Sequence, residues 1–429
     1  MSISKRTWLL VFLVLGALCV AWRMAPLAQQ PLGAVQLSAT FPGDVAKGAS
    51  ATDIDRFSWE SFVAANWPSS GKGIIGQGGD HPAAWQFWKS DADVLVPDGI
   101  VPIPWKQPSP IPADCTQPAA PGTRILTHDT KMGKLGDFLT PASGPLIDQN
   151  GEYARFEILV NEPMYNFILA NQLYSVNGQK AYDPGGTVTL PSGALNGATG
   201  AIMIKIAWKI LGANDDPKRF HTSLAYLYNS TASPKCQLKQ VGMVGMHISH
   251  KTQNAPQWVW STFEHVDNAP LVGSTAKGSF SFNDGAAKHQ SVGCDSNGNC
   301  NTLPQGKWDP INGVKTPVQV ARLTDFTKTA NFINAQYEAA LLAVDKASVF
   351  ANYRLVGTQF PSDPTNVNDP AGVLFPQFLA NTTMETYLQG ETTNVSSSCG
   401  ACHFKAVMAG VSGSRTSDFS FLLARVGMK

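Results

Sequence analysis

The stretch AIMIKIAWKI, residues 201–210, carries the clearest secondary-structure signal in the chain. Every even-numbered position from Ile202 to Ile210 is large and apolar, whereas Lys205 and Lys209 fall on odd-numbered positions. This period of two is typical of a β-strand. Comparable runs are EYARFEILV (152–160), HTSLAYLYN (221–229), LKQVGMVGMHI (238–248) and PQWVWSTFEHV (256–266). No long helix is predicted between these runs, so the sequence predicts an antiparallel sheet.

Two segments predict helices on either side of this strand-rich region. Residues 53–66 place apolar side chains at helical spacing and are stopped by Pro68, and residues 324–346 predict the longest helix. The run VFANYRLVGTQF (349–360) predicts a further strand, and residues 68–150, rich in Gly and Pro, predict loops. The predicted fold class is therefore α+β, with a loop-rich antiparallel-sheet body, a few helices and a C-terminal helical segment.

Composition and charge restrict the class of protein. The chain has 429 residues, of which 43% are hydrophobic, and can bury a large core. Charged residues make up 15%, and 32 basic against 31 acidic residues leave a net charge of +1. Nucleic-acid-binding domains usually carry a basic surplus. We therefore expect no nucleic-acid partner.

The N-terminus predicts export. Lys5 and Arg6 precede TWLLVFLVLGALCVAW (7–22), an uncharged and mainly apolar run. Such a run is typical of a signal peptide and is short for a membrane span, so residues 1–28 are predicted to be a signal peptide or an N-terminal membrane anchor, followed by a linker over 29–50. The positive-inside rule puts the N-terminus in the cytoplasm. Cleavage would give a soluble periplasmic protein, and an uncleaved segment would attach the chain to the inner membrane by residues 7–22.

Six of the seven cysteines follow this segment, and in an oxidising compartment they are expected to pair or be modified. Cys294 and Cys300 flank the turn-forming residues 295–299, which predicts a disulfide between them. Cys115 with Cys236 is then the remaining pair, although four cysteines permit three connectivities.

Residues 399–403 read Cys-Gly-Ala-Cys-His, the C-x-x-C-H pattern of haem attachment. Two cysteines three positions apart on a helical turn face the same way, so both thiols can form thioether bonds to the two vinyl groups of one haem. The adjacent His403 then supplies its imidazole to the iron as the proximal ligand. The motif predicts one covalent haem c on Cys399 and Cys402, and export agrees because this haem is attached outside the cytoplasm.

The motif resembles that of c-type cytochromes, and three longer segments extend the resemblance. They are FSWESFVAANWP (57–68), WVWSTFEHVDNAP (258–270) and LANTTMETYLQ (379–389) followed by SSSCGACH (396–403). Together they are similar to a group of bacterial cytochrome c family proteins, large single-haem proteins with a C-terminal C-x-x-C-H motif. The similarity spans most of the mature chain. It implies one haem in a large protein and no particular substrate.

Other interpretations of C-x-x-C fit the surrounding sequence less well. A thioredoxin-like pair begins a helix after the strand of a βαβ unit, whereas TTMETYLQ precedes this motif and predicts a helix start with a capping box from Thr382 to Glu385. A zinc site needs two more ligands, and none lies close in sequence. A plain disulfide across the motif stays open.

The second axial ligand of the iron is expected to come from upstream of the motif. Only 26 residues follow His403, and Met408 is predicted to share its helix. His265 is the first candidate because Asp267 would lie on the same strand face and could orient the imidazole. His247 is the second, although its offset of three from His250 puts those two histidines on opposite strand faces. Met246 and Met384 are softer candidates.

These observations predict an exported electron carrier with redox proteins as partners. A β-rich α+β body over 51–320 is expected to carry a helix and a haem-binding segment over 321–429. Whether the protein is also an enzyme is left open by the sequence. An open distal iron site acting on a small molecule would make it a haem-dependent oxidoreductase, and a haem-based sensor is a third interpretation.

Overall fold

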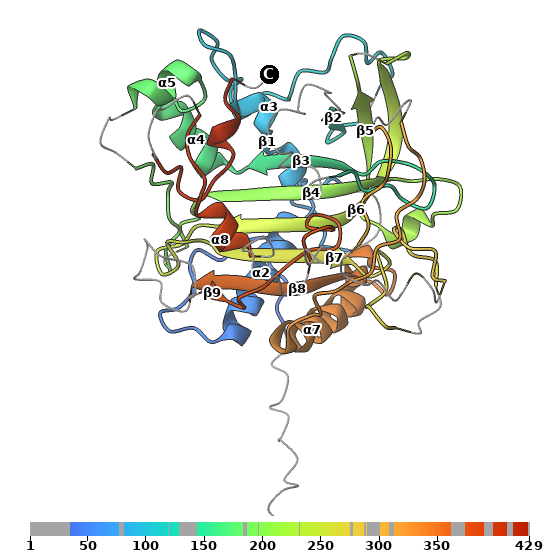
Figure 1. Cartoon of the computed structure of the whole chain (residues 1–429). Coiled ribbons are helices and arrows are strands. Elements are labelled where there is room, and N and C mark those ends of the chain that lie inside the picture. Colours follow the sequence, from blue (N-terminus) through green and yellow to red (C-terminus); the bar gives the residue numbers. More distant parts are fainter. Residues whose placement is uncertain are drawn as a thin grey trace, which may run out of the picture. The chain divides into compact units, whose positions relative to one another are not determined.

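A sheet of nine strands is the central element of the structure, a computed structural model (Figure 1). The order β1-β3-β4-β6-β7-β8-β9 forms the main path, while β5 pairs with β6 and β2 pairs with β5. All pairs are antiparallel except β2 with β5. The strands are β1 (Lys89–Ser90), β2 (Arg124–Thr127), β3 (Arg155–Val160), β4 (Ile202–Ile210), β5 (Thr222–Tyr228), β6 (Cys236–His250), β7 (Val259–His265), β8 (Tyr353–Pro361) and β9 (Leu374–Phe375).

The structure describes residues 35–76, 81–118, 120–127, 144–182, 187–195, 197–230, 232–274, 278–286, 289, 301–308, 313–361, 374–389, 398–409 and 415–427. The α-helices within them are α2 (Ala51–Ala65), α3 (Asp91–Val94), α4 (Glu162–Ala170), α5 (Val176–Ala181), α7 (Lys328–Val344) and α8 (Cys399–His403). Short 3-10 helices are Ala84–Phe87, Pro217–Arg219, Val349–Asn352 and Leu423–Arg425.

The predicted α+β class is confirmed, and each of the five predicted runs in the middle of the chain contains a strand. The first helix spans 51–65 because Ser50 caps it in a capping box with Asp53. The long helix begins after the Thr327 cap and ends at Val344, so it is shorter than predicted. Residues 349–352 form a 3-10 turn, and the predicted strand begins only at Tyr353.

One predicted helix is wrong. Residues 382–389 form turns, although Thr382 and Glu385 have the spacing of a capping box. Tertiary contacts use these side chains instead: Thr382 donates to Glu264 of β7, at 2.6 Å from its amide and 2.7 Å from its hydroxyl. Glu385 accepts from the Asn381 amide at 2.9 Å. The predicted segment 321–429 therefore does more than carry a motif, because its strands β8 and β9 complete the sheet.

The two faces of the sheet are covered by different parts of the chain. Helix α2 packs on the face of Phe263, whose ring stacks on Phe62 at 4.3 Å between centroids. Helix α8 packs on the opposite face, which we call the α8 face, where His403 contacts Trp260 at 4.4 Å between ring centroids. Strand residues alternate between faces, so Trp260 and Phe263 point in opposite directions. Figure 1 shows α8 in front of the sheet and α2 behind it.

The cysteine predictions have different outcomes. Cys115 and Cys236 form a disulfide that joins the loop before β2 to the start of β6. Cys294 and Cys300 lie outside the described residues, as does the apolar segment 7–22. Among the residues that the structure does describe, no helix is long and apolar enough to cross a membrane.

Two buried histidines should make the protein acid-sensitive. Burial lowers the pKa of His221 to about 4 and that of His250 to about 3. Below pH 6.5 these histidines are protonated in the unfolded chain but stay neutral in the folded protein. The stability present above pH 6.5 is therefore lost as the pH falls towards the pKa values of the folded state. We expect the free energy of unfolding to drop by up to about 1.4 kcal/mol per pH unit for each histidine. Urea unfolding between pH 7.5 and 5.5 measures this slope.

The matched variants are His250→Phe, which should reduce the slope by the contribution of one histidine, and His81→Phe at an exposed position, which should leave it unchanged. A wild-type slope near zero in this interval would contradict the assignment.

Candidate functional site

Helix α8 contains the whole CGACH motif and is held on the sheet by Gln359 of β8. The Gly400 amide donates to Oε1 of Gln359 at 2.8 Å, and Nε2 of Gln359 lies 3.0 Å from Oγ of Ser398. A Cβ atom on Gly400 would lie 2.8 Å from Cδ2 of Leu374 in β9. A larger residue at this position of the motif would therefore require the flexible side chain of Leu374 to move.

The two cysteines of the motif lie on one side of α8 and are not joined in a disulfide. Burial raises the pKa of the thiol in both Cys399 and Cys402, so both are neutral at pH 7. Cys402 nevertheless remains accessible to solvent.

Only one of the two ring nitrogens of His403 is engaged by the Phe419 carbonyl. Its Nδ1 lies 2.7 Å from the carbonyl oxygen of Phe419, which accepts the hydrogen bond. Burial lowers the pKa of His403 to about 4, so its imidazole is neutral at pH 7. With the proton on Nδ1, the lone pair is on Nε2, and this is the arrangement found in metal-ligating histidines.

The carbonyl that holds His403 belongs to a turn in an unfavourable backbone conformation. Asp418 and Phe419 have φ values of 53° and 63°, in the left-handed region that few non-glycine residues adopt. A buried ion pair holds the turn, with Nζ of Lys251 at 2.7 Å and 2.5 Å from the two carboxylate oxygens of Asp418. The Leu190 amide donates to the same carboxylate at 2.7 Å. The ion pair therefore fixes the position of the Phe419 carbonyl.

The register of the sheet arranges the α8 face in rows that run across the strands. In the first row, Ser249 pairs with Met203 and Trp260, and in the third, Gly245 pairs with Ala207 and Glu264. The middle row consists of Lys205, His247 and Thr262. Side chains within a row are cross-strand neighbours, and successive rows are about 7 Å apart.

The first and third rows are covered by different segments of the C-terminal region. His403 and Ser420 lie over the first row, where Oγ of Ser420 is 3.8 Å from the sulfur of Met203. Over the third row, Thr382 binds Glu264, and a Cβ on Gly245 would lie only 2.3 Å from Oγ1 of Thr383. The middle row lies between these two coverings.

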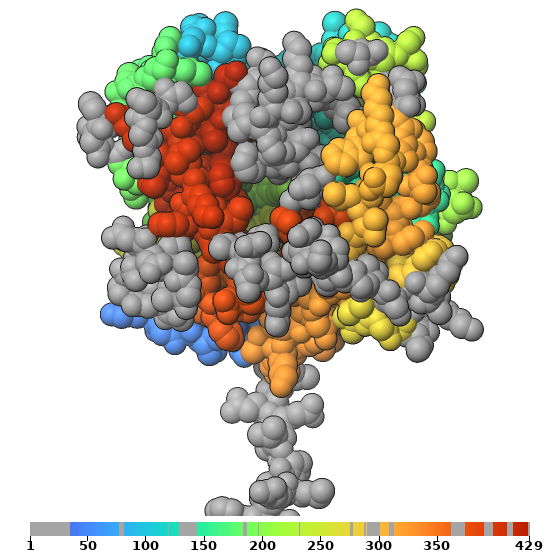
Figure 2. Space-filling view, viewed as in Figure 1, coloured from blue at the N-terminus to red at the C-terminus, as the bar shows by residue number. Residues whose placement is uncertain are grey.

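Part of this middle row forms the floor of a recess, which we call the α8 recess. Its floor is Lys205 and His247, with Glu385 on one side and α8 on the other. Thr262 completes the row but is buried beneath Asn381. The charges of Lys205, His247 and Glu385 all act on the pKa of His403, which places these groups close together. Figure 2 shows green atoms of the sheet deep in a recess beside the red C-terminal segment.

The polar groups of the recess interact mainly with each other. Nε2 of His247 lies 3.4 Å from Oε2 of Glu385, an ion-pair contact. Burial opposes ionisation of Glu385, but His247, Lys205 and the Asn381 amide together lower the pKa of this carboxyl. Burial lowers the pKa of Lys205, whose ammonium lies 5.5 Å from the ring centroid of Phe156.

The structure separates the two histidines proposed for the distal side. His247 lies in the α8 recess, whereas His265 lies on the opposite face and is fully buried. The Nε2 atom of His265 is 2.8 Å from the Arg219 carbonyl oxygen, and Nδ1 accepts from the Asp267 amide at 3.1 Å. Both ring nitrogens of His265 are therefore engaged.

The softer candidates are also placed away from the recess. Met246 points to the α2 side of the sheet, where its sulfur accepts from Nδ2 of Asn66 at 3.7 Å. Met384 is buried in an apolar cluster with Ala207 and Phe282. Met408 is buried in a second cluster.

Sequence reasoning missed Lys205 and Glu385. Lys205 is one of two charged residues, with Lys209, in a mainly apolar run, which was the available signal. Glu385 carried a misleading signal, because its spacing from Thr382 matched a helix cap.

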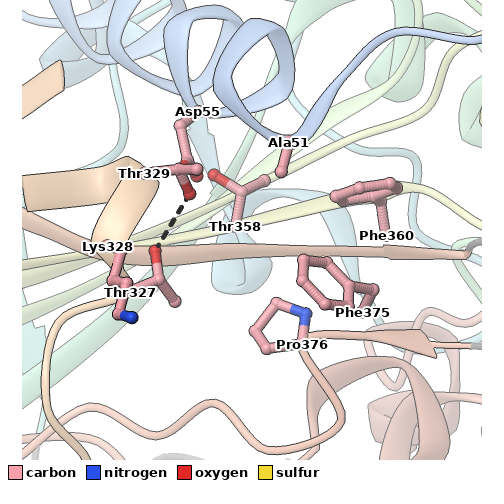
Figure 3. Close-up of a pocket in the computed structure, with 9 residues that line it drawn as sticks. All are labelled: Ala51, Asp55, Thr327, Lys328, Thr329, Thr358, Phe360, Phe375 and Pro376. Atoms are coloured by element: carbon pink, nitrogen blue, oxygen red, sulfur yellow. Dashed lines mark hydrogen bonds between the residues drawn. The ribbon is translucent and has the colours of Figure 1, made fainter. Parts of the chain in front are cut away.

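A pocket elsewhere in the structure has no connection to the motif. It has a volume of about 230 Å³ and lies between α2, α7, β8 and β9. Figure 3 shows the carboxylate of Asp55 near Thr329 and Thr358, with Phe360 and Phe375 across the pocket. Burial raises the pKa of Asp55. None of the motif residues lines this pocket.

Within the described ranges, no group of three or more His, Cys, Asp or Glu side chains could hold a bare metal ion. No family model, curated protein or solved structure matches this chain. The assignment of the site therefore depends on its motif and geometry.

The ion pair behind the His403 turn gives a test of the site's architecture. Lys251→Met leaves the carboxylate of Asp418 buried without its partner, and we expect a loss of about 3–5 kcal/mol in the free energy of unfolding. The double variant Lys251→Met/Asp418→Asn should recover part of this loss, because no buried charge remains and Asn tolerates the left-handed backbone. Urea unfolding measures both.

The matched control is Lys235→Met, which removes a pair with Asp114 whose side chains are 49% and 43% exposed. It should change the free energy of unfolding by less than about 1 kcal/mol. Equal effects of the two lysine variants would show that the buried pair does not hold the turn.

Proposed function

We propose that the chain is an exported c-type cytochrome that carries one haem covalently bound to Cys399 and Cys402 and transfers electrons in the periplasm. The observation that carries this proposal is the state of His403. Its Nδ1 is fixed by the Phe419 carbonyl, so Nε2 is free to act as the proximal iron ligand beside two unpaired thiols. The chemistry of these three residues fits haem c.

The attachment needs no oxidant or reductant beyond the reduced thiols. Each thiol would add its sulfur to one carbon of a vinyl group and its hydrogen to the other, so that a C–S bond and a C–H bond would form as the S–H bond and the C=C π bond are lost. The product is an uncharged thioether. It suits Cys399 and Cys402 because burial disfavours a thiolate at these positions.

The bound haem would supply a one-electron couple, and the chain's own residues would set its environment. Trp260 and Phe421 pack against the imidazole of His403, at 4.4 Å and 5.2 Å between ring centroids, and restrict its rotation. The α8 recess gives partial access from solvent, which suits exchange of electrons with other redox proteins. We propose such proteins as the partners.

Two further observations support an extracytoplasmic location. The Cys115–Cys236 disulfide is of the kind that persists in oxidising compartments. The basic and apolar N-terminal sequence has the character of an export signal or of an anchor in the inner membrane.

A second candidate function is a haem-dependent oxidoreductase. The polar side chains of Lys205, His247 and Glu385 in the α8 recess favour it, because such groups could bind a small molecule next to an open iron site. Binding of carbon monoxide to the reduced protein distinguishes the two functions: a closed, six-coordinate iron supports the carrier, and an open iron supports the oxidoreductase.

The covalent haem is tested by producing the protein together with haem-maturation machinery. We expect a c-type absorbance spectrum and a mass increase of one haem that survives denaturation, since thioether bonds do not depend on the fold. Cys399→Ala/Cys402→Ala should lose both signals completely. The double variant Cys115→Ala/Cys236→Ala, which removes the disulfide far from α8, is the control and should keep them. Wild-type protein without a covalent mass increase would refute the proposal.

A further inference from the structure

We propose that His247 is the second axial ligand of the haem iron and that Glu385 is its positioning residue. The inference rests on the proposed function, because it requires a haem on α8. It assigns the distal side of the iron to strand β6, which is far from α8 in sequence.

The first argument is the state of the His247 side chain. It is 18% exposed, and its Nε2 lies beside the carboxylate of Glu385. The other ring nitrogen, Nδ1, makes no hydrogen bond in the described part of the chain and is available to a metal. Both ring nitrogens of His265, by contrast, are engaged.

The second argument is the carboxylate beside the ring. Oε2 of Glu385 lies 3.4 Å from Nε2 of His247, and the Asn381 amide fixes the same oxygen at 2.9 Å. Asn381 is in turn held on β7, where its Nδ2 donates to Oγ1 of Thr262 at 2.8 Å. Metal-ligating histidines commonly direct one ring nitrogen to a carboxylate and the other to the metal. His247 has the carboxylate already in place.

The third argument is position. His403 packs on Trp260, which pairs with Ser249 in the first row, and His247 lies two residues before Ser249 on β6, in the next row. Adjacent rows are about 7 Å apart. A group attached to α8 therefore lies about one row away from Lys205 and His247, the two residues of the middle row whose side chains are partly exposed.

Lys205 is the other nitrogen donor on the floor of the recess. Its ammonium is directed towards Phe156 on β3, at 5.5 Å from the ring centroid, and so away from Thr262 on β7. It has no carboxylate comparable to the one beside His247 within ion-pair distance in the described part of the chain. We therefore assign the ligand to His247 and not to Lys205.

The experiment uses the haem-loaded protein and follows absorbance and electron paramagnetic resonance spectra, carbon monoxide binding and the reduction potential. Wild type should be low-spin and should not bind carbon monoxide. His247→Ala should become high-spin in the oxidised form and bind carbon monoxide when reduced, and added imidazole should restore the low-spin spectrum. His81→Ala, at an exposed position, is the matched control and should behave as wild type.

Two variants separate ligation from a structural role. His247→Met keeps a side chain that can bind iron, and it should stay six-coordinate with a reduction potential shifted to more positive values, as expected for a methionine ligand. Glu385→Gln should stay low-spin, with a smaller positive shift, because the imidazole loses its anionic partner. If His247→Ala fails to fold, the shift in His247→Met decides the question.

The outcomes distinguish this inference from the function on which it rests. A wild-type protein without covalent haem overturns the proposed function. A haem-loaded wild type whose spectra are unchanged in both His247 variants overturns only the inference. Loss of the low-spin spectrum in Lys205→Met, with His247→Ala unaffected, also overturns it and assigns the ligand to Lys205. A high-spin wild type that binds carbon monoxide overturns it and favours the oxidoreductase.

Discussion

The pairing of β4 with β6 is the constraint on which the remaining structure depends. It places Lys205 opposite His247, and the pairing of β6 with β7 adds Thr262 to the same row. Because the side-chain period of a strand is two, a slip of one residue would move these polar groups to the face covered by α2. On that face they would meet the aromatic side chains around Phe62 and Phe263. The hydrophobic pattern therefore fixes the register, and the register fixes the position of the polar row.

The C-terminal region is attached to the sheet by buried polar contacts as well as by apolar packing. Glu264 binds Thr382 and also Arg322, at 2.8 Å, and Lys251 binds Asp418. Buried charges are tolerated when each has a well-placed partner. These contacts hold two segments on either side of the middle row, and the recess results from the gap between them. The site is thus built from a continuous sheet and two C-terminal segments that are attached to it by separate contacts.

Local signals explain why much of the architecture was predictable. Alternation of apolar residues identified the strands, and helical spacing identified the two long helices. Their predicted starts at residues 53 and 324 missed the caps Ser50 and Thr327, after which the helices begin. The helix predicted from the spacing of Thr382 and Glu385 was wrong. Their side chains contact Glu264 and His247 and do not form a helix cap. Local signals could not choose between His247 and His265 either. Both lie in strands with two buried faces, and the alternation of such a strand does not show which face another segment will cover.

The sequence by itself determined the strand-rich α+β class and the presence of two thiols and an imidazole within five residues, because both depend on neighbours along the chain. Only the tertiary structure decided what surrounds that motif. The Phe419 carbonyl that orients His403 depends on a left-handed turn held by Lys251, which is 167 residues away from Asp418. The polar row beneath α8 depends on the pairing of three strands. Contacts of this kind arise from the packing of distant segments, so short sequence patterns do not predict them.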